Sequence, residues 1–232
     1  MGKALFWDFD GTLIHPNESF LDAMKHAITV YYHSILATEI RSFLHTTCSW
    51  YTPEISYVGE TGQKWWTNLF CRFDSFYKQH NIPKAEWEKI NAAFQKEIWN
   101  PDNYTLYSDA LAVLHRSGEM GFQNYILSNN YPELPLVIDK LGLSGYFTDY
   151  IVSSNVGYEK PRKELFDFAR SIAQNPNCCY MIGDNPAADI GGGILAGMKT
   201  ILVHRSGDFG ADAVCESLSE IPSLLAEWEK AD

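Results

Sequence analysis

Two aspartates stand two residues apart near the start of the chain, in the segment FWDFDGTL at positions 6–13. The apolar run 4–7 predicts a buried strand of a parallel sheet. Gly11 permits a turn, so we expect Asp8 and Asp10 to converge at the carboxyl end of that strand, where ligands of open α/β sheets bind. Two close carboxylates repel each other unless a cation, a shared proton, or both stabilise them.

Metal binding combined with proton transfer is the chemistry that suits this pair. We expect Mg²⁺ to take a carboxylate oxygen from Asp8, because hard divalent ions prefer oxygen ligands. Asp10 would keep a proton and act as an acid. A pair of solvated turn carboxylates is the alternative, since short motifs often arise by chance. The rest of the chain decides between the two interpretations.

Three further polar clusters each follow a predicted strand. Ser128 and Asn129 offer a hydroxyl and turn N–H groups that can bind an anionic oxygen. Lys160 directly precedes a predicted helix, and Asp184 and Asp189 form the pattern G-D-x-x-x-x-D. Taken singly, these clusters are typical of a helix cap, a solvated lysine and acidic helix capping. Their shared position at strand ends favours a single site.

The elements that must position these clusters form an α/β pattern. From Tyr104 onward, short apolar runs alternate with stretches of helical spacing, which predicts a parallel, doubly wound sheet. A Gly-rich helix is predicted over 187–196. The predicted strands are 4–7, 125–127, 150–152, 179–182 and 200–203.

Between the first strand and this alternating pattern lies a long helical stretch. Over 16–103, apolar and aromatic side chains recur at helical spacing, as in Trp66, Phe70 and Phe73. We expect a small four-helix bundle that is interrupted by a loop over 49–63. We interpret the aromatic stripes as its core, with a base-stacking surface as the alternative.

Composition limits the possible partners. The chain has 232 residues, enough for a core domain and a smaller second unit, and its formal net charge is −11. This surplus of carboxylates argues against nucleic acid and against a membrane as partner. We expect neither a spanning segment nor a signal peptide, which predicts a cytoplasmic protein. The five cysteines lack C-x-x-C spacing and indicate buried thiols rather than disulfides or a zinc site.

In this order and at these strand ends, the four clusters resemble the haloacid dehalogenase-like hydrolase superfamily over essentially the whole chain. The stretch from Asp189 to Met198, with its glycines, is similar to the family's helix after the acidic motif. The resemblance implies a Rossmann-like catalytic core made of residues 1–15 and 104–232. It also implies that 16–103 forms a helical cap of the C1 type over the active site, as in the capped phosphatases.

The resemblance assigns the chemistry to the two N-terminal aspartates. Asp8 would be the nucleophile that attacks phosphorus and forms an aspartyl-phosphate intermediate. Asp10 would protonate the leaving oxygen and then deprotonate the water that hydrolyses the intermediate. The cofactor Mg²⁺ would be held by Asp8, Asp184 and the backbone carbonyl of Asp10.

The same resemblance gives phosphate-binding roles to the remaining clusters. Ser128 and Lys160 would bind the transferring phosphoryl oxygens, and Lys160 would also compensate charge around the nucleophile. Thr12 and Asn129 would complete the phosphate-binding set through supporting hydrogen bonds. Asp189 would stand behind the metal ligands rather than bind the ion.

We therefore predict an Mg²⁺-dependent phosphatase that acts on a small phosphorylated metabolite. Asp10 argues against a dehalogenase, because that branch needs no protonated leaving group and lacks a carboxylic acid at this position. A phosphomutase would use the same residues, and a non-catalytic binding or regulatory protein would retain the same fold. A sugar phosphate, a nucleoside monophosphate and phosphoglycolate all fit as substrates, and no oligomeric state is predicted.

The segment 14–17, which reads Ile-His-Pro-Asn, departs from the pattern, because many capped members carry an acidic residue and a serine after the first motif. His15, Asn17 and Glu18 lie where the core meets the helical stretch. They either contact the leaving group or form a hinge and a helix cap, and we favour the second interpretation.

Overall fold

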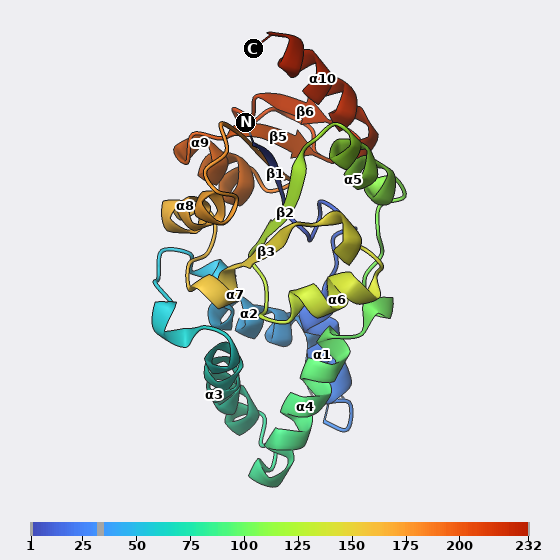
Figure 1. The fold of residues 1–232 in the computed structure, drawn as a ribbon. Coiled ribbons are helices and arrows are strands. Elements are labelled where there is room, and N and C mark those ends of the chain that lie inside the picture. Colours follow the sequence, from blue (N-terminus) through green and yellow to red (C-terminus); the bar gives the residue numbers. More distant parts are fainter. Residues whose placement is uncertain (1, 32–34, 232) are drawn as a thin grey trace.

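The computed structural model describes residues 2–31 and 35–231, and its centre is a six-stranded parallel sheet (Figure 1). The strands lie in the order β3-β2-β1-β4-β5-β6. Their bounds are β1 Lys3–Trp7, β2 Gln123–Ser128, β3 Asp149–Val152, β4 Cys178–Gly183, β5 Lys199–Val203 and β6 Ala213–Cys215. The predicted fold class is confirmed, and β6 is the strand that the sequence pattern does not predict.

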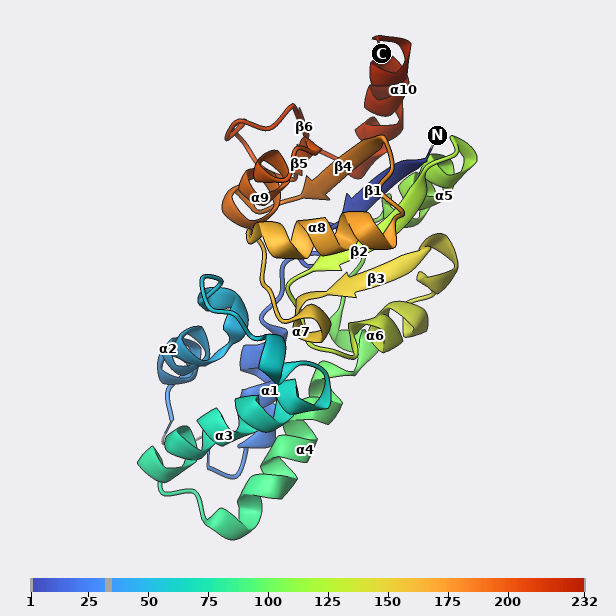
Figure 2. The same cartoon turned by 60° about the vertical axis from the view of Figure 1, so that its left-hand side comes forward.

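Helices cover both faces of the sheet (Figure 2). Successive strand residues point to opposite faces, so Leu5 and Trp7 pack in one core with α5, α6 and α10. Ala4 and Phe6 pack on the other face with α8. The flanking helices are α5 Ala110–Glu119, α6 Leu134–Lys140, α7 Ser153–Val156, α8 Lys163–Ile172, α9 Gly192–Leu195 and α10 Ile221–Ala231.

The Gly-rich helix predicted over 187–196 begins differently from an ordinary α-helix. A wide π-helical turn, Pro186–Gly191, comes first, and α9 follows it. In that turn the N–H of Ile190 donates to the carbonyl of Asn185, five residues earlier, at 3.3 Å. Such single π turns are frequent at functional sites.

Four α-helices lie in the described residues between β1 and α5, with bounds α1 Ser19–Ala27, α2 Ala37–Thr47, α3 Gln63–Gln79 and α4 Trp87–Ile98. Helix α1 packs against α2 and α4, and α3 packs against the same two helices. Trp66, Phe73 and Tyr77 of α3 are at most 1% exposed, so the interpretation of this stripe as core is confirmed. The limits of the inserted unit, after residue 15 and after residue 103, stay predictions.

The inserted helices are attached to the sheet by more than their two chain connections. In the loop between α2 and α3, the N–H of Tyr57 donates to the carbonyl of Gly157 at 2.8 Å. In the same loop, Ser49 Oγ donates to the carboxyl of Glu159 at 2.5 Å. Glu159 is 2% exposed, and this burial raises its pKa above the ordinary value. The loop therefore holds the insert against the segment around α7.

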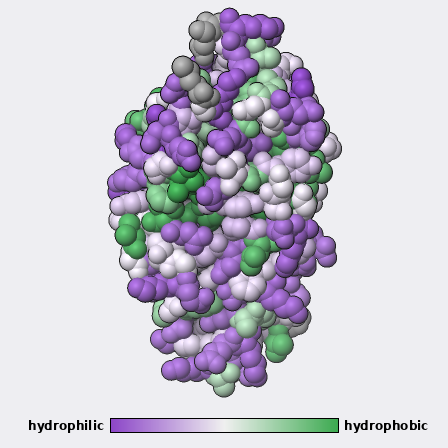
Figure 3. All heavy atoms as spheres, viewed as in Figure 1, coloured by the Kyte–Doolittle hydropathy of each residue, from purple (hydrophilic) through white to green (hydrophobic). Residues whose placement is uncertain are grey.

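The face of the molecule seen in Figure 3 is mostly hydrophilic. This agrees with the large excess of acidic over basic residues, 29 against 18. Among the described residues, no helix combines the length and the apolar character needed to cross a membrane.

Gly157→Ala should loosen this attachment. Gly157 has φ +91°, and an added Cβ would lie 2.4 Å from the Cα of Val58. We expect the free energy of unfolding to fall by about 1–2 kcal/mol for the left-handed backbone and by about 2 kcal/mol more for the clash. Urea unfolding of the variant measures the sum of these two losses. Gly121→Ala is the matched control, because Gly121 has φ +84° and open space around it. An equal loss of unfolding free energy in the two variants would contradict the close approach of Gly157 to Val58.

Candidate active site

A cavity of about 670 Å³ lies where the carboxyl ends of β1, β2 and β4 face the inserted helices. Most of the predicted site residues line it from the sheet side: Asp8, Asp10, Ser128, Asn129, Lys160 and Asp184. The insert contributes residues of α1, of α2 and of the loop after α2. The structure thus brings together side chains that are far apart in the sequence, with Asp8 and Asp184 separated by 176 positions.

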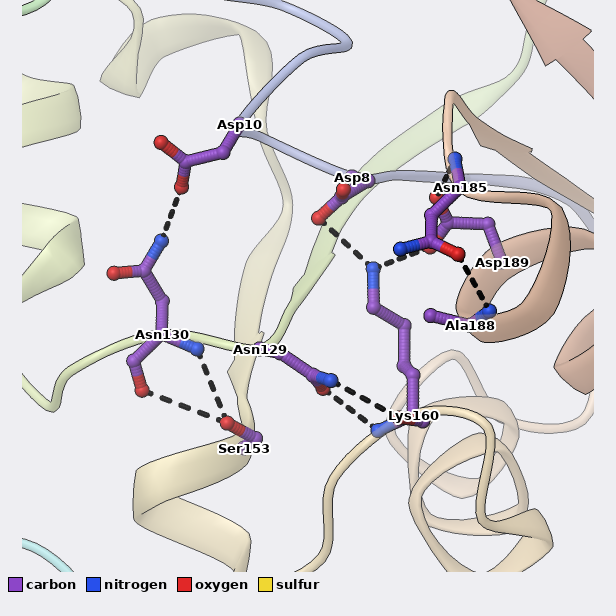
Figure 4. A network of polar contacts seen from close by, with 9 residues as sticks. All are labelled: Asp8, Asp10, Asn129, Asn130, Ser153, Lys160, Asn185, Ala188 and Asp189. Carbon is purple, nitrogen blue, oxygen red and sulfur yellow. Dashed lines mark hydrogen bonds and ion pairs between the residues drawn. The ribbon is translucent and has the colours of Figure 1, made fainter. Parts of the chain in front are cut away.

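Lys160 lies between two carboxylates (Figure 4). Its Nζ is 2.8 Å from Asp8 Oδ1 and 2.6 Å from Asp189 Oδ1, and the residue is 2% exposed. Burial by itself lowers the pKa of Lys160, but the charges of Asp189 and Asp8 outweigh it and raise that pKa above the ordinary value. The lysine is therefore a fixed positive charge beside the Asp8 carboxylate.

Asn129 positions this lysine. Its side-chain Oδ1 accepts from the N–H of Lys160 at 2.7 Å, and its Nδ2 donates to the carbonyl of Lys160 at 3.0 Å. The amide of Asn129 thus binds backbone on both sides, and it ties the end of β2 to the segment before α8. The structure gives Asn129 a role in orienting Lys160, whereas the predicted hydrogen bond to phosphate remains a prediction.

Asp189 is fully buried behind the cavity. One carboxylate oxygen accepts from Lys160, and the other accepts from the N–H of Asn185 at 3.0 Å. The wide turn that begins at Pro186 carries Asp189 into this position. The hydrogen bond from Asn185 fixes the carboxylate of Asp189, and this carboxylate in turn holds the ammonium group of Lys160 in place.

Asp10 has a different environment from Asp8. Asn130 Nδ2 donates to one of its oxygens at 2.6 Å, and Asn17 Nδ2 donates to the other at 3.1 Å. Burial and the neighbouring charge of Asp8 raise the pKa of Asp10 to about 7. A carboxyl with this pKa can hold a proton near neutral pH and return it, which is what an acid and base catalyst requires.

Asp184 completes the acidic side of the cavity. Burial and the charge of Asp8 raise its pKa above the ordinary value, and Arg205, whose Nη2 lies 3.0 Å from Asp184 Oδ2, acts in the opposite direction. Gly11 packs directly against this carboxylate, since a Cβ there would lie 2.6 Å from the Cγ of Asp184. The glycine of the first motif is thus needed for close approach as well as for its φ of +79°.

The donor set fits a divalent cation. Oxygens of Asp8, Asp184 and Asp189 lie within 4.8 Å of one another. Carboxylate oxygens are the preferred ligands of Mg²⁺, and a bound ion would relieve the repulsion between these closely spaced carboxylates. Since Asp189 already binds Lys160 and Asn185, Asp8 and Asp184 are the carboxylates best placed to hold the ion.

The two hydroxyl residues of the predicted phosphate-binding set lie in different places. Ser128 ends β2 and lines the cavity. Thr12 is fully buried, does not line the cavity, and its hydroxyl has no hydrogen-bond partner among the described residues. The structure therefore does not bring Thr12 to the phosphate-binding surface, because the turn after Asp10 directs the side chain into the protein.

Sequence reasoning missed two polar partners and left a third undecided. Asn130 and Arg205 were not assigned roles, although each follows a strand that ends at the cavity. Asn17 is predicted either to contact the leaving group or to form part of a hinge and helix cap. Its Oδ1 accepts from the N–H of Ser19 at the start of α1 at 2.9 Å, which fits the second interpretation, and its Nδ2 donates to Asp10. Contact with the leaving group stays a prediction. Position after a strand was the available signal for Asn130 and Arg205.

The sheet and the site at its carboxyl edge place the chain among the doubly wound α/β proteins, and comparison with known proteins defines the family. A sequence model for haloacid dehalogenase-like hydrolases matches residues 3–197. Pyrimidine 5'-nucleotidase YjjG of Escherichia coli is 32% identical over 167 residues, which cover 67% of this chain and 70% of that protein. The chain belongs to the haloacid dehalogenase-like hydrolase family.

Other relatives match over shorter stretches or by fold. Phosphoserine phosphatase of Thermus thermophilus is 35% identical over 106 residues, or 44% of this chain and 42% of that protein. The solved structure of the HAD-hydrolase YfnB from Bacillus subtilis superimposes with a TM-score of 0.70 at 20% identity, covering 97% of this chain and 99% of that one. The structure of a 2-haloacid dehalogenase from Pseudomonas syringae superimposes with a TM-score of 0.72 at 20% identity, covering 98% of this chain and 100% of that one. These structural likenesses show a shared fold.

Asp189→Asn should destabilise the protein through Lys160. The substitution removes one of two charges that compensate a buried ammonium, and breaking a buried ion pair typically costs about 3–5 kcal/mol. Because Asp8 remains, we expect a loss of about 3 kcal/mol in the free energy of unfolding, measured with urea. Asp167→Asn is the control, since Asp167 pairs with Lys163 at 2.6 Å on the surface and should change stability little. A small loss for both would show that Asp189 does not hold Lys160.

Proposed function

We propose that the protein is an Mg²⁺-dependent phosphatase that hydrolyses a small phosphomonoester through an aspartyl-phosphate intermediate. The observation that carries the proposal is the contact between Lys160 Nζ and Asp8 Oδ1 at 2.8 Å, with the protonatable Asp10 in the same cavity. A fixed cation beside one carboxylate and a proton on the other are the two requirements of the reaction.

In the first step, a carboxylate oxygen of Asp8 attacks phosphorus and the bond from phosphorus to the ester oxygen breaks. The leaving oxygen takes the proton of Asp10, so an alcohol departs. In the second step, Asp10 accepts a proton from water while the water oxygen attacks phosphorus, and the bond from phosphorus to the Asp8 oxygen breaks. Inorganic phosphate leaves, Asp8 is a carboxylate again, and Asp10 is protonated again.

Charge compensation in these steps comes from residues that are already in place. The phosphoryl group carries charge on three equatorial oxygens during transfer, so catalysis rests on positioning and on positive groups. Lys160 supplies a fixed ammonium, and Ser128 supplies a hydroxyl from the end of β2. Both are held by the rigid sheet edge, which reduces the reorganisation needed in the transition state.

Asp8 and Asp184 would hold the metal ion, with the backbone carbonyl of Asp10 as a further ligand. When bound, Mg²⁺ supplies positive charge next to the nucleophile and the phosphoryl oxygens. Asp189 would keep Lys160 beside this site. The YfnB structure, of a protein with the same fold, is described as bound to magnesium, which supports the assignment.

Relatives support phosphate chemistry but not one substrate. Their names include a pyrimidine 5'-nucleotidase, a phosphoserine phosphatase and a pyrophosphatase. Structures of dehalogenases share the fold, yet Asp10 favours a phosphate ester, because an alkoxide leaving group needs a proton and a halide does not. In this proposal the inserted helices act as a C1-type cap, and the partner is a small phosphorylated metabolite rather than nucleic acid or a membrane.

Asp8→Asn should abolish phosphate release. An amide cannot form the acyl phosphate, so we expect kcat to fall by at least about 10³-fold. Asp10→Asn should cost about 10²- to 10⁴-fold, because the acid and base is lost while the nucleophile remains. The rates of both variants are measured as release of inorganic phosphate from a panel of phosphomonoesters. Asp22→Asn, on the exposed face of α1, is the control.

Other outcomes would direct the assignment elsewhere. Asp8-dependent halide release from 2-haloacids, without phosphate release, would identify a dehalogenase. Interconversion of two sugar phosphates would identify a mutase. A folded protein that binds phosphomonoesters but shows no Asp8-dependent turnover of any of them would identify a binding protein.

Mg²⁺ should stabilise the protein through the same carboxylates. A ligand that binds only the folded state raises the melting temperature by mass action. We expect added Mg²⁺ to raise Tm in the native protein and to have no effect in Asp184→Asn, measured by thermal unfolding with and without chelator. Asp22→Asn should keep the full Mg²⁺ effect. If Asp184→Asn responds to Mg²⁺ as the native protein does, the ion binds elsewhere.

A further inference from the structure

A connected series of aromatic rings runs from the sheet side of the cavity to its insert side. Tyr131 follows Asn130 on the sheet side, and its ring centroid is 6.2 Å from that of Phe20 on α1. Phe20 lies 4.9 Å from Trp50, and Trp50 lies 6.3 Å from Tyr51. All four rings line the cavity. The series therefore leads from the residues that bind Asp10 out to the loop after α2.

At its outer end the series terminates in an exposed stacked pair. Tyr51 and His45 have ring centroids 4.1 Å apart and ring planes that differ by 19°. Both line the cavity, and Tyr51 is 47% exposed. One face of the Tyr51 ring is covered by His45, and the exposed surface can take a further planar group. Five of the aromatic residues of α3, by contrast, are buried in the core of the insert: Trp65, Trp66, Phe73, Phe76 and Tyr77.

The charges of the cavity limit what else the substrate can carry. Every lysine and arginine among the described lining residues has a carboxylate partner. Arg41 binds Glu18 at 2.7 Å, and Arg205 binds Asp184 at 3.0 Å, while Lys160 is held by Asp8 and Asp189. Lys160 and the metal ion would be engaged with the phosphoryl group, which leaves Arg41 and Arg205 as the cations for any second anionic group. Each of these arginines already lies against a carboxylate, so such a group would meet Glu18 or Asp184 as well, and this repulsion is costly.

We propose that the leaving group is uncharged and planar at its far end, and that the substrate is a nucleoside 5′-monophosphate whose base stacks on Tyr51. This inference rests on the proposed phosphatase function and specifies its substrate class. Bases stack on exposed aromatic rings with little dependence on sequence, and a cavity of about 670 Å³ is of the size that holds such a ligand. Phosphoglycolate, phosphoserine and pyrophosphate are disfavoured, because each carries a second acidic group.

The test compares uridine and adenosine 5′-monophosphate with ribose 5-phosphate, which keeps the sugar and the phosphate but lacks the base. We expect kcat/KM to be at least about tenfold higher for the two nucleotides, from the stacking of the base. Phosphoglycolate, phosphoserine and pyrophosphate should be weaker than either nucleotide. Equal rates for the nucleotides and ribose 5-phosphate, or a preference for an acidic leaving group, would overturn the inference.

Variants of the ring assign the effect to Tyr51. Tyr51→Ala should raise KM for uridine 5′-monophosphate about tenfold with little change in kcat, because stacking contributes equally in the ground state and the transition state. It should raise KM for ribose 5-phosphate less than KM for uridine 5′-monophosphate, so that the nucleotide preference falls, and Tyr51→Phe should retain the nucleotide preference. Phe168→Ala on α8 is the matched control, since Phe168 is 42% exposed and lies outside the cavity lining.

The outcomes separate this inference from the function on which it rests. Asp8-dependent release of phosphate without nucleotide preference, or a preference unchanged in Tyr51→Ala, overturns the substrate class alone. Absence of Asp8-dependent release from every probe overturns the phosphatase assignment. In that case, titration calorimetry of the Asp8→Asn variant still decides base recognition, because uridine 5′-monophosphate should bind more tightly than ribose 5-phosphate and equal affinities would overturn it.

Discussion

The site depends on one buried ammonium group, that of Lys160, held between Asp8 and Asp189. An isolated charge at 2% exposure would be expensive, and two carboxylates with additional hydrogen bonds make it tolerable. Each partner comes from a different strand end: Asp8 follows β1, Asn129 follows β2 and orients the lysine backbone, and Asp189 lies in the turn after β4. The parallel sheet is what brings these ends together, so fold and charge arrangement depend on each other.

The two aspartates of the first motif differ through their surroundings. Asp8 lies 2.8 Å from the Lys160 ammonium, whereas Asp10 accepts hydrogen bonds from two side-chain amides. Burial together with the charge of Asp8 raises the pKa of Asp10 to about 7, although the two amides act in the opposite direction. In the proposed reaction, these two environments suit the first side chain to act as the nucleophile and the second to act as the acid. This separation of roles by environment is a general means of running acid and base chemistry near neutral pH. Gly11 lets the turn that follows Asp10 pass directly against the carboxylate of Asp184.

Sequence patterns predicted the sheet, the helices of the insert and six site residues that line the cavity, because strand periodicity and position after a strand are local signals. The π turn before α9 and strand β6 were missed, since the first depends on a single hydrogen-bond shift and the second has only three residues. Arg205 and Asn130 were missed because their partners are distant in sequence. The resemblance to the family implies that Thr12 binds phosphate, but its side chain is fully buried and does not line the cavity. A motif match does not determine which way a turn directs a side chain.

The insert is more than a cover, because it also orients the chemistry. Asn17, in the connection to α1, binds Asp10 with one end of its amide and the N–H of Ser19 with the other. The acid is therefore held partly by the segment that carries the first inserted helix. On the other side, the loop after α2 bonds to Glu159, the neighbour of Lys160, while the same loop presents Tyr51 to the cavity. A displacement of the insert would disturb Asp10 and Tyr51 together, and in the proposed reaction this links the chemistry to recognition of the leaving group.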